Sequence, residues 1–183
     1  MVDWPKRDPD SIHQYYRDKL QSINDCQFRF IVIRDPIKRF LSAYSNRVIH
    51  YGELSKTYCD RHSVDLEGLP FTPDLATFID NLQAYRDKVE SICSHTMCLG
   101  QFVQKRFDTD LARVLETVNV YRIEDIRELQ KDLSNFLGSQ VVFPHLQTGG
   151  PKFRLENLSE QQVSQLTSFY HQDYQLIEKY YRV

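Results

Sequence analysis

The most regular pattern of hydrophobic and polar positions lies between residues 28 and 50. Residues 30–33 form a short apolar run rich in β-branched side chains, which is typical of a strand covered on both faces. After Pro36 the apolar residues recur at helical spacing. Asp35 suits the N-cap and Pro36 the first helical position, where a missing N–H costs nothing. The pattern predicts a strand that runs directly into a helix over residues 36–50.

The rest of the chain is mainly helical in its pattern, with one further alternating strand. Gly138 is a natural end for one helix, and Ser159 with Gln162 forms a capping box at the start of another. The predicted segments are a helix over 10–20, an irregular stretch over 51–71, a helix over 74–85 that extends toward residue 89, a strand over 118–123, a helix over 124–137, a third short apolar run over 141–143 and a helix over 159–181.

The order of these elements indicates the fold class. Strands that alternate with helices imply an α/β sandwich with a parallel sheet. A chain of 183 residues with 41% hydrophobic content can bury a sizeable core, and we expect a single domain over residues 1–183. The stretch over 51–71 is long for a loop inside a domain, which is typical of a functional or mobile segment.

Composition narrows the classes of function. The net charge of −2 gives no domain-wide basic field, so we expect no nucleic-acid partner. No run of about 18 apolar residues occurs, so we expect no membrane span in this chain. The cysteines (Cys26, Cys59, Cys93 and Cys98) form no CxxC pair and favour free thiols in a reducing compartment. Two disulfides, and a zinc site at Cys93 and Cys98 around His95, remain as weaker alternatives.

Arg34 is the first candidate for a binding role. It lies at the carboxyl end of the predicted strand, beside the free N–H groups of a helix start. The polar side of that helix carries Lys38, Arg39 and Ser42. Guanidinium and hydroxyl donors at a helix N-terminus favour an anion. The alternative is an ordinary N-cap at Asp35 with a solvated arginine before it.

This segment resembles the 3′-phosphate-binding segment of sulfotransferases that use 3′-phosphoadenosine 5′-phosphosulfate (PAPS), especially the carbohydrate sulfotransferase branch and its bacterial relatives. The shared pattern of Arg-Asp-Pro, a further arginine and Ser-x-Tyr falls on Arg34, Asp35, Pro36, Arg39, Ser42 and Tyr44. The resemblance implies that Arg34 and Ser42 bind the 3′-phosphate. Lys38 and Arg39 would support it, although a solvated face explains Lys38 and a structural ion pair, for instance with Asp35, explains Arg39.

The resemblance also extends to a loop near the C-terminal end of the chain. Residues 144–150 lie where the family has a loop that closes over the nucleotide. Gln147 and Gly149 stand there in place of an Asn and a Ser of the family pattern. Lys152 is counted with them among the candidate donor-binding residues.

Two further segments look like structural parts of the same family. Residues 120–126 are similar to its second sheet strand, and residues 169–174 to its terminal Tyr-x-x-Asp-Tyr signature, which is largely structural. The implied fold is a P-loop-like three-layer sandwich around a central parallel sheet. The resemblance covers residues 28–181.

His95 is the candidate catalytic base. Residues 94–97 resemble family positions near the nucleotide and acceptor, and an imidazole titrates near pH ~6.5, close to a useful range. A hydrogen-bonded structural histidine is the alternative. Glu124 could serve as a base or a polar contact, or cap a helix. The other histidines considered are His13, His50, His62, His145 and His171.

One feature departs from the family. Its members bind the 5′-phosphosulfate with a Lys-Thr-Gly-Ser/Thr-Ser/Thr loop upstream of the Arg-Asp-Pro segment, and this sequence contains no such loop. Residues 148–152 are nearest in composition, but Pro151 lacks the N–H that a phosphate cradle needs. We therefore expect an N-terminally truncated sulfotransferase domain, either the C-terminal part of a longer enzyme or a homologue with an incomplete donor site.

The resemblance implies transfer of a sulfuryl group from PAPS to a hydroxyl, in the first place of a carbohydrate, with PAP as product and no metal. The alternative is a non-catalytic domain that binds PAP or an interaction partner. A nucleoside or nucleotide kinase is a third and weaker reading, since the Gly-x-x-x-x-Gly-Lys-Ser/Thr loop is missing. A bacterial chain of this kind would work in the cytoplasm, and a eukaryotic one in the Golgi lumen. The oligomeric state is left open.

Overall fold

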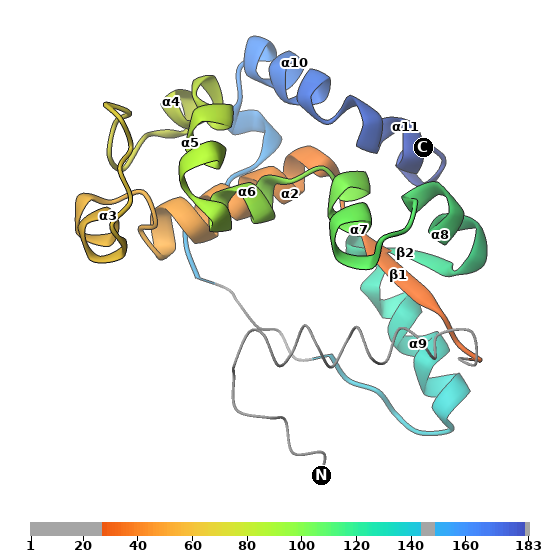
Figure 1. Cartoon of the computed structure of the whole chain (residues 1–183). Coiled ribbons are helices and arrows are strands. Elements are labelled where there is room, and N and C mark those ends of the chain that lie inside the picture. Colours follow the sequence, from red (N-terminus) through yellow and green to blue (C-terminus); the bar gives the residue numbers. More distant parts are fainter. Residues whose placement is uncertain (1–26, 144–148, 182–183) are drawn as a thin grey trace.

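A computed structural model describes residues 27–143 and 149–181, which form helices around a small parallel sheet (Figure 1). The predicted α/β class is confirmed. The elements in chain order are β1 (Phe30–Ile33), α2 (Pro36–Ala43), η2 (Tyr44–His50), α3 (Lys56–His62), α4 (Leu75–Asp80), α5 (Leu82–Lys88), α6 (Glu90–Thr96), α7 (Leu99–Phe107), α8 (Leu111–Thr117), β2 (Asn119–Arg122), η3 (Ile123–Asp125), α9 (Ile126–Leu137), η4 (Leu155–Asn157), α10 (Glu160–Phe169) and α11 (His171–Tyr181).

The predicted junction of strand and helix is confirmed. The Asp35 carboxylate caps α2 by accepting a hydrogen bond from the Lys38 backbone N–H at 2.9 Å, and Pro36 occupies the first turn. The buried side of α2 carries Ile37, Phe40 and other apolar residues. Local sequence therefore determines both where α2 begins and which side faces the core.

The helix predicted over residues 36–50 changes its winding after Ala43. η2 is a π-helix, closed by a hydrogen bond from the Tyr51 N–H to the Asn46 carbonyl at 2.9 Å. A π-helical turn bonds residues five positions apart and is often found at functional sites. The spacing of the apolar residues alone did not indicate this change.

The stretch over residues 51–71, predicted to be irregular, contains α3. The Ser55 hydroxyl caps α3 by accepting from the Tyr58 N–H at 3.2 Å, and Ser63 ends it in a left-handed conformation with φ 54°. Most side chains of α3 are exposed, and only Cys59 is buried. The helix therefore has no apolar periodicity by which the sequence could reveal it.

Two predicted helices are divided in the structure. The helix over 74–85 breaks at Asn81 into α4 and α5, and the terminal helix breaks at Tyr170 into α10 and α11. The capping box of Ser159 and Gln162 at the start of α10 is confirmed. The helix predicted over residues 10–20 lies outside the described residues.

The sheet is parallel, as predicted. β1 and β2 pair with Ile31 beside Val120 and Ile33 beside Arg122, and in the described residues the sheet has these two strands. The three-layer arrangement stays a prediction. The apolar run over 141–143 forms no strand, because it is held to the end of α9 by a hydrogen bond from the Val141 N–H to the Ser134 hydroxyl at 2.9 Å.

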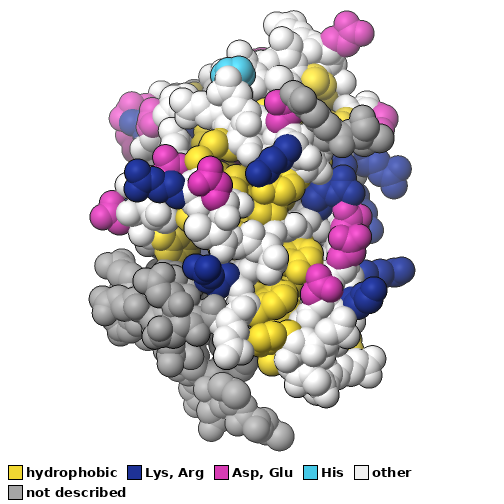
Figure 2. Space-filling model, turned by 90° about the vertical axis from the view of Figure 1, so that its right-hand side faces the viewer, with side chains coloured by type: hydrophobic (Ala, Val, Ile, Leu, Met, Phe, Trp, Pro, Cys, Tyr) yellow, Lys and Arg dark blue, Asp and Glu magenta, His cyan; other side chains and the backbone are white. Residues whose placement is uncertain are grey.

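Two hydrophobic clusters form the core of the described chain. The larger packs α2 against α4, α5, α6 and α10 and includes Phe40 and Phe78, whose ring centroids lie 5.6 Å apart. The smaller joins Ile33 of β1 to α7, α8 and α11. On the face shown in Figure 2, hydrophobic side chains form patches between charged ones. Nowhere in the described chain is a helix long and apolar enough for a membrane span.

Asp173 of α11 connects three helices, α2, α7 and α11. Its side chain is 1% exposed and accepts hydrogen bonds from the backbone N–H groups of Leu99, at 2.7 Å, and Gly100, at 3.3 Å. It therefore caps α7 from another helix. The Arg39 guanidinium of α2 donates to Asp173 at 3.2 Å and to the Met97 carbonyl at 2.6 Å. The partner of Arg39 is thus Asp173 and not Asp35.

The two tyrosines of the Tyr-x-x-Asp-Tyr signature extend this connection. The buried Tyr170 hydroxyl donates to the Thr96 carbonyl at 2.8 Å, at the end of α6. The Tyr174 hydroxyl donates to the Asp35 carboxylate at 3.2 Å, at the start of α2. The described structure thus agrees with the predicted structural role of this signature.

Substitution of Asp173 should destabilise the protein strongly. Asp173→Ala leaves the α7 amides and Arg39 without their common acceptor, and removal of one partner from a buried ion pair typically costs about 3–5 kcal/mol. Urea denaturation followed by circular dichroism measures the loss. The control is Asp60→Ala, in the exposed pair that Asp60 forms with Lys56 at 3.1 Å, which should cost less than about 1 kcal/mol. Equal losses in the two variants would contradict the central role of Asp173.

Candidate functional site

A cavity of about 560 Å³ lies along the polar side of α2 and η2. Its walls come from residues 34–47, from α6 and from residues 149–154. Among its described lining residues none is acidic and five are basic, namely Arg34, Arg39, Arg47, Lys152 and Arg154. A concave surface lined by one sign of charge concentrates ligands of the opposite sign. The cavity is therefore suited to an anionic ligand.

Six of the eight residues predicted for the site line this cavity. Lys38 does not line it, since its ammonium group extends toward Glu124 at 3.5 Å. Glu124 also accepts a hydrogen bond from the Tyr181 hydroxyl at 3.1 Å, so it is held in contacts between elements. Gln147 lies outside the described residues. The six lining residues are Arg34, Arg39, Ser42, His95, Gly149 and Lys152.

Arg34 and Ser42 reach the cavity from one strand end and one helix. Arg34 follows β1 directly and is half-buried, whereas Ser42 lies on the exposed side of α2. Among the described residues Arg34 forms no ion pair. The neighbouring Asp35 carboxylate accepts hydrogen bonds from the Lys38 N–H and the Tyr174 hydroxyl. The charge of Arg34 is thus available to a ligand.

Residues 149–154 form the wall that faces η2. The Ser45 hydroxyl donates to the Pro151 carbonyl at 2.5 Å. Gly150 has φ +90°, and a Cβ there would lie 2.6 Å from the Ser45 carbonyl oxygen. A Cβ at Gly149 would lie 2.6 Å from the His50 ring. The two glycines therefore allow the backbone to approach η2 closely, which places Lys152 at the cavity.

His95 belongs to a closed ring of polar contacts. The Arg47 guanidinium donates to Glu53 at 3.1 Å through Nη1 and to His95 Nε2 at 2.6 Å through Nη2. His95 Nδ1 lies 2.7 Å from the Ser91 carbonyl, and the Ser91 hydroxyl donates to the second oxygen of Glu53 at 2.5 Å. Since a guanidinium only donates, Nε2 accepts and the proton of the neutral ring is on Nδ1.

Burial lowers the pKa of His95 below its usual value. The positive charge of Arg47 lowers the pKa further, while the bond to the Ser91 carbonyl and the negative charge of Glu53 act in the opposite direction. The imidazole is therefore neutral at pH 7. A neutral imidazole is the form that a general base requires, although Arg47 occupies its acceptor nitrogen.

The sequence pattern did not identify Arg47 as part of the site. Counted as an α-helix, residues 38–50 place Ser45 and Asn46 on the polar side with Ser42. Arg47 lies in the π-helix η2, whose backbone hydrogen bonds join residues five positions apart, so α-helical counting does not give the direction of its side chain. Glu53 was missed as well: it is 5% exposed, and one of its partners, Ser91, lies 38 residues away in the sequence. No sequence pattern around Arg154 indicated that it belongs to the site.

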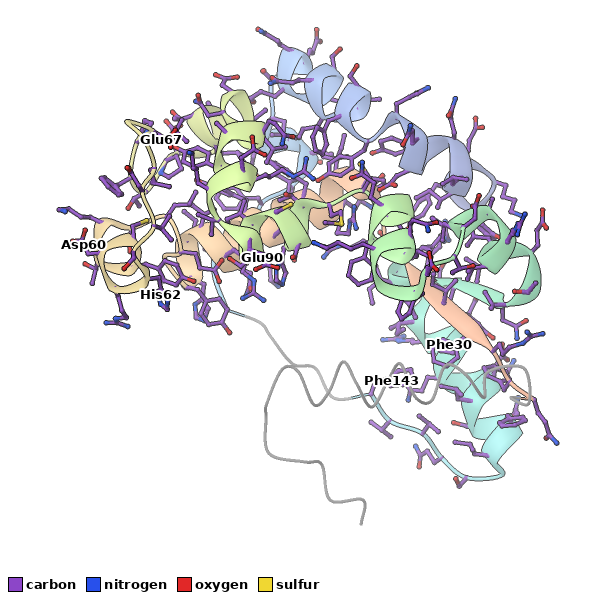
Figure 3. All side chains as sticks on the ribbon, in the orientation of Figure 1. Phe30, Asp60, His62, Glu67, Glu90 and Phe143 are labelled. Atoms are coloured by element: carbon purple, nitrogen blue, oxygen red, sulfur yellow. The ribbon has the colours of Figure 1, made fainter. Side chains whose placement is uncertain are left out.

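Two other described histidines, His50 and His62, contact neighbouring tyrosine rings. His62 stacks on Tyr58 at 4.2 Å between ring centroids, and Figure 3 shows it on α3, at the far end of the molecule from Phe30. The described cysteines are free, and no cluster of three or more metal-ligating side chains occurs in residues 27–143 or 149–181. The zinc alternative around His95 thus gains no support.

The close approach of Gly150 to η2 can be tested against a glycine with the same conformation in open space. Gly150→Ala introduces a Cβ that meets Ser45, whereas Gly68 has φ +86° and nothing within 4 Å of its virtual Cβ. Gly150→Ala and Gly68→Ala both carry the backbone strain of a positive φ, but only Gly150→Ala should loosen residues 149–154. Trypsin cleavage after Lys152, followed by mass spectrometry, should accelerate in Gly150→Ala alone. Equal cleavage rates in wild type and Gly150→Ala would refute the tight packing.

Comparison with known proteins identifies the family of the chain. A sequence model of the sulfotransferase family matches residues 4–180. No curated protein and no solved structure matches the chain at a significant level. The family match covers nearly the whole sequence, and it includes every residue that lines the basic cavity. The chain therefore belongs to the sulfotransferase family.

Proposed function

We propose that the protein transfers a sulfuryl group from PAPS to an acceptor hydroxyl, with a carbohydrate as the expected class of acceptor. The observation that carries the proposal is the convergence of Arg34, Ser42 and Lys152 on one basic cavity, from segments that resemble the donor-binding segments of the family. Members of the family generally use PAPS. A donor with a 3′-phosphate and a 5′-phosphosulfate suits a cavity whose described lining residues include five basic and no acidic side chains.

The 3′-phosphate of the donor is assigned to Arg34 and Ser42. Arg34 forms no ion pair within the described chain, and its planar fork of N–H donors matches phosphate oxygens. The exposed Ser42 hydroxyl supplies a further hydrogen bond from the same side of α2. Arg39 already donates to Asp173 and Met97, so its proposed role is to hold α2 in position beneath the phosphate.

The transfer step needs a group that accepts the proton of the acceptor hydroxyl. Sulfuryl transfer resembles phosphoryl transfer, in which positioning and charge stabilisation supply most of the catalysis. His95 is the proposed base: it is neutral, it lines the cavity, and its Nδ1–H is held by the Ser91 carbonyl. The proton would move to Nε2 as the acceptor oxygen forms its bond to sulfur and the bond to the 5′-phosphate oxygen breaks.

A second candidate is binding of PAP without transfer. The sequence lacks the Lys-Thr-Gly-Ser/Thr-Ser/Thr loop that holds the 5′-phosphosulfate in the family. The 3′-phosphate half of the donor site has assigned residues, and the 5′-half has none. A domain of this kind would keep its affinity for the nucleotide and act through interaction with a partner.

Substitution of Arg34 should remove the preference for a 3′-phosphate. Loss of a hydrogen bond to a charged group costs about 1.5–3 kcal/mol, so Arg34→Ala should bind PAP roughly 10- to 150-fold more weakly. Its affinity for adenosine 5′-phosphate, which lacks the 3′-phosphate, should change little. Ser42→Ala should weaken PAP binding by about 2- to 10-fold. Calorimetry measures both ligands, with Arg61→Ala on the exposed side of α3 as the control. No PAP binding, or binding unchanged in Arg34→Ala, would contradict the assignment.

Transfer of labelled sulfate from PAPS to a panel of glycans separates the two candidates. Transfer that disappears in His95→Gln, with PAP affinity unchanged, is the expected result for an enzyme with His95 as its base. PAP binding without transfer to any acceptor would instead establish the non-catalytic function.

A further inference from the structure

The contact between Arg47 and His95 places a cation on the nitrogen that would have to accept a proton. The distance from Arg47 Nη2 to His95 Nε2 is 2.6 Å, and His95 Nδ1 is hydrogen-bonded to the Ser91 carbonyl. In this arrangement the imidazole has no free acceptor. His95 can work as a base only if Arg47 first moves away from Nε2.

Arg47 is the member of the ring whose bonding is incomplete. Its Nε is buried and has no hydrogen-bond partner among the described residues. Its side chain is 25% exposed and lines the cavity, whereas the Glu53 side chain is 7% exposed. A guanidinium that donates to a neutral imidazole forms a weaker bond than one that donates to an oxyanion. An oxyanion in the cavity therefore competes with His95 for Nη2.

We propose that Arg47 is an oxyanion-responsive switch on His95. Without a ligand it covers Nε2. A sulfate-type oxyanion, carried either by the donor or by the acceptor, draws the guanidinium toward itself and exposes Nε2. This inference rests on the proposed function, because it assigns the order of events at the same site.

The switch couples two requirements of the transfer step. As Arg47 moves to the oxyanion it offers its charge to the oxygens around sulfur, and His95 becomes able to take the hydroxyl proton. The proton then resides on Nε2, and the resulting imidazolium keeps its Nδ1–H on the Ser91 carbonyl. Glu53 is anchored by the Ser91 hydroxyl, so its negative charge remains beside the ring in both states.

The groups that face this ring come from several elements. Glu53 and Arg47 act directly on His95, and the Tyr58 hydroxyl of α3 interacts with Ser91. The Tyr51 ring packs on the Arg47 guanidinium, with 5.2 Å between its carbon and the ring centroid. Burial raises the pKa of Tyr58, so this hydroxyl stays neutral near pH 7. Near pH 7, His95 is thus the member of the ring whose protonation would change when Arg47 moves.

Nuclear magnetic resonance of the histidine nitrogens tests the switch on the full chain. In wild type without ligand we expect the Nδ1–H tautomer and a lowered pKa for His95. Inorganic sulfate, compared with chloride at equal ionic strength, should shift the Nε2 signal and raise the pKa. If the oxyanion is the sulfuryl group of the donor, PAPS should have the same effect. PAP, which lacks that group, should have none. A response to sulfate without a response to PAPS assigns the oxyanion to the acceptor.

Two substitutions of Arg47 make the test specific. Arg47→Gln should show the raised pKa of His95 already without ligand and no further response to sulfate. Arg47→Lys serves if Arg47→Gln fails to fold, because it keeps a positive charge beside Glu53. The single side-chain nitrogen of the lysine should leave His95 Nε2 free. Arg61→Gln changes the same charge on the exposed side of α3 and should respond like wild type.

Two results would overturn the switch. One is a His95 signal in wild type that sulfate and PAPS leave unchanged while PAP binding still depends on Arg34. The other is an equal sulfate response in wild type and in Arg47→Gln. Loss of PAP binding itself would instead count against the proposed function, so the two failures are distinguishable.

Discussion

The buried carboxylate of Asp173 is the interaction on which the rest of the structure depends. It accepts two amides at the start of α7 and the guanidinium of Arg39. A buried charge is tolerated only when it is paired and hydrogen-bonded, so α2, α7 and α11 must meet in one arrangement to satisfy it. Tyr170, between α10 and α11, bonds to the end of α6, and Tyr174 of α11 bonds to the N-cap of α2. The position of α2 is thereby determined from several directions.

The rigidity of α2 matters because the helix serves the core and the cavity at once. Its apolar side packs in the larger cluster through Phe40, and its polar side presents Ser42. Arg34 lies at the end of β1, where the strand passes into the helix. A phosphate bound at this junction meets donors whose positions are set by the core. Such preorganisation reduces the entropy that binding would otherwise cost.

The cations of the cavity fall into two groups by their partners. Arg39 and Arg47 each pair with a buried carboxylate, Asp173 and Glu53. Arg34 has no such partner in the described chain and remains available to neutralise a ligand. Five basic residues gather at one cavity, and buried carboxylates hold two of them, which explains how a chain with a net charge of −2 can offer a basic site.

The sequence by itself determined the features that depend on near neighbours: the strand and helix at residues 30–43 and the caps at Asp35 and Ser159. It also predicted six of the residues that line the cavity. It did not reveal the breaks at the ends of α4 and α10, the π-helical turn of η2, or the ring that includes Glu53 and His95. The ring depends on contacts between residues tens of positions apart, such as the 48-residue separation of Arg47 and His95. Only the packing of helices brings such partners together, and no periodicity along the chain records it.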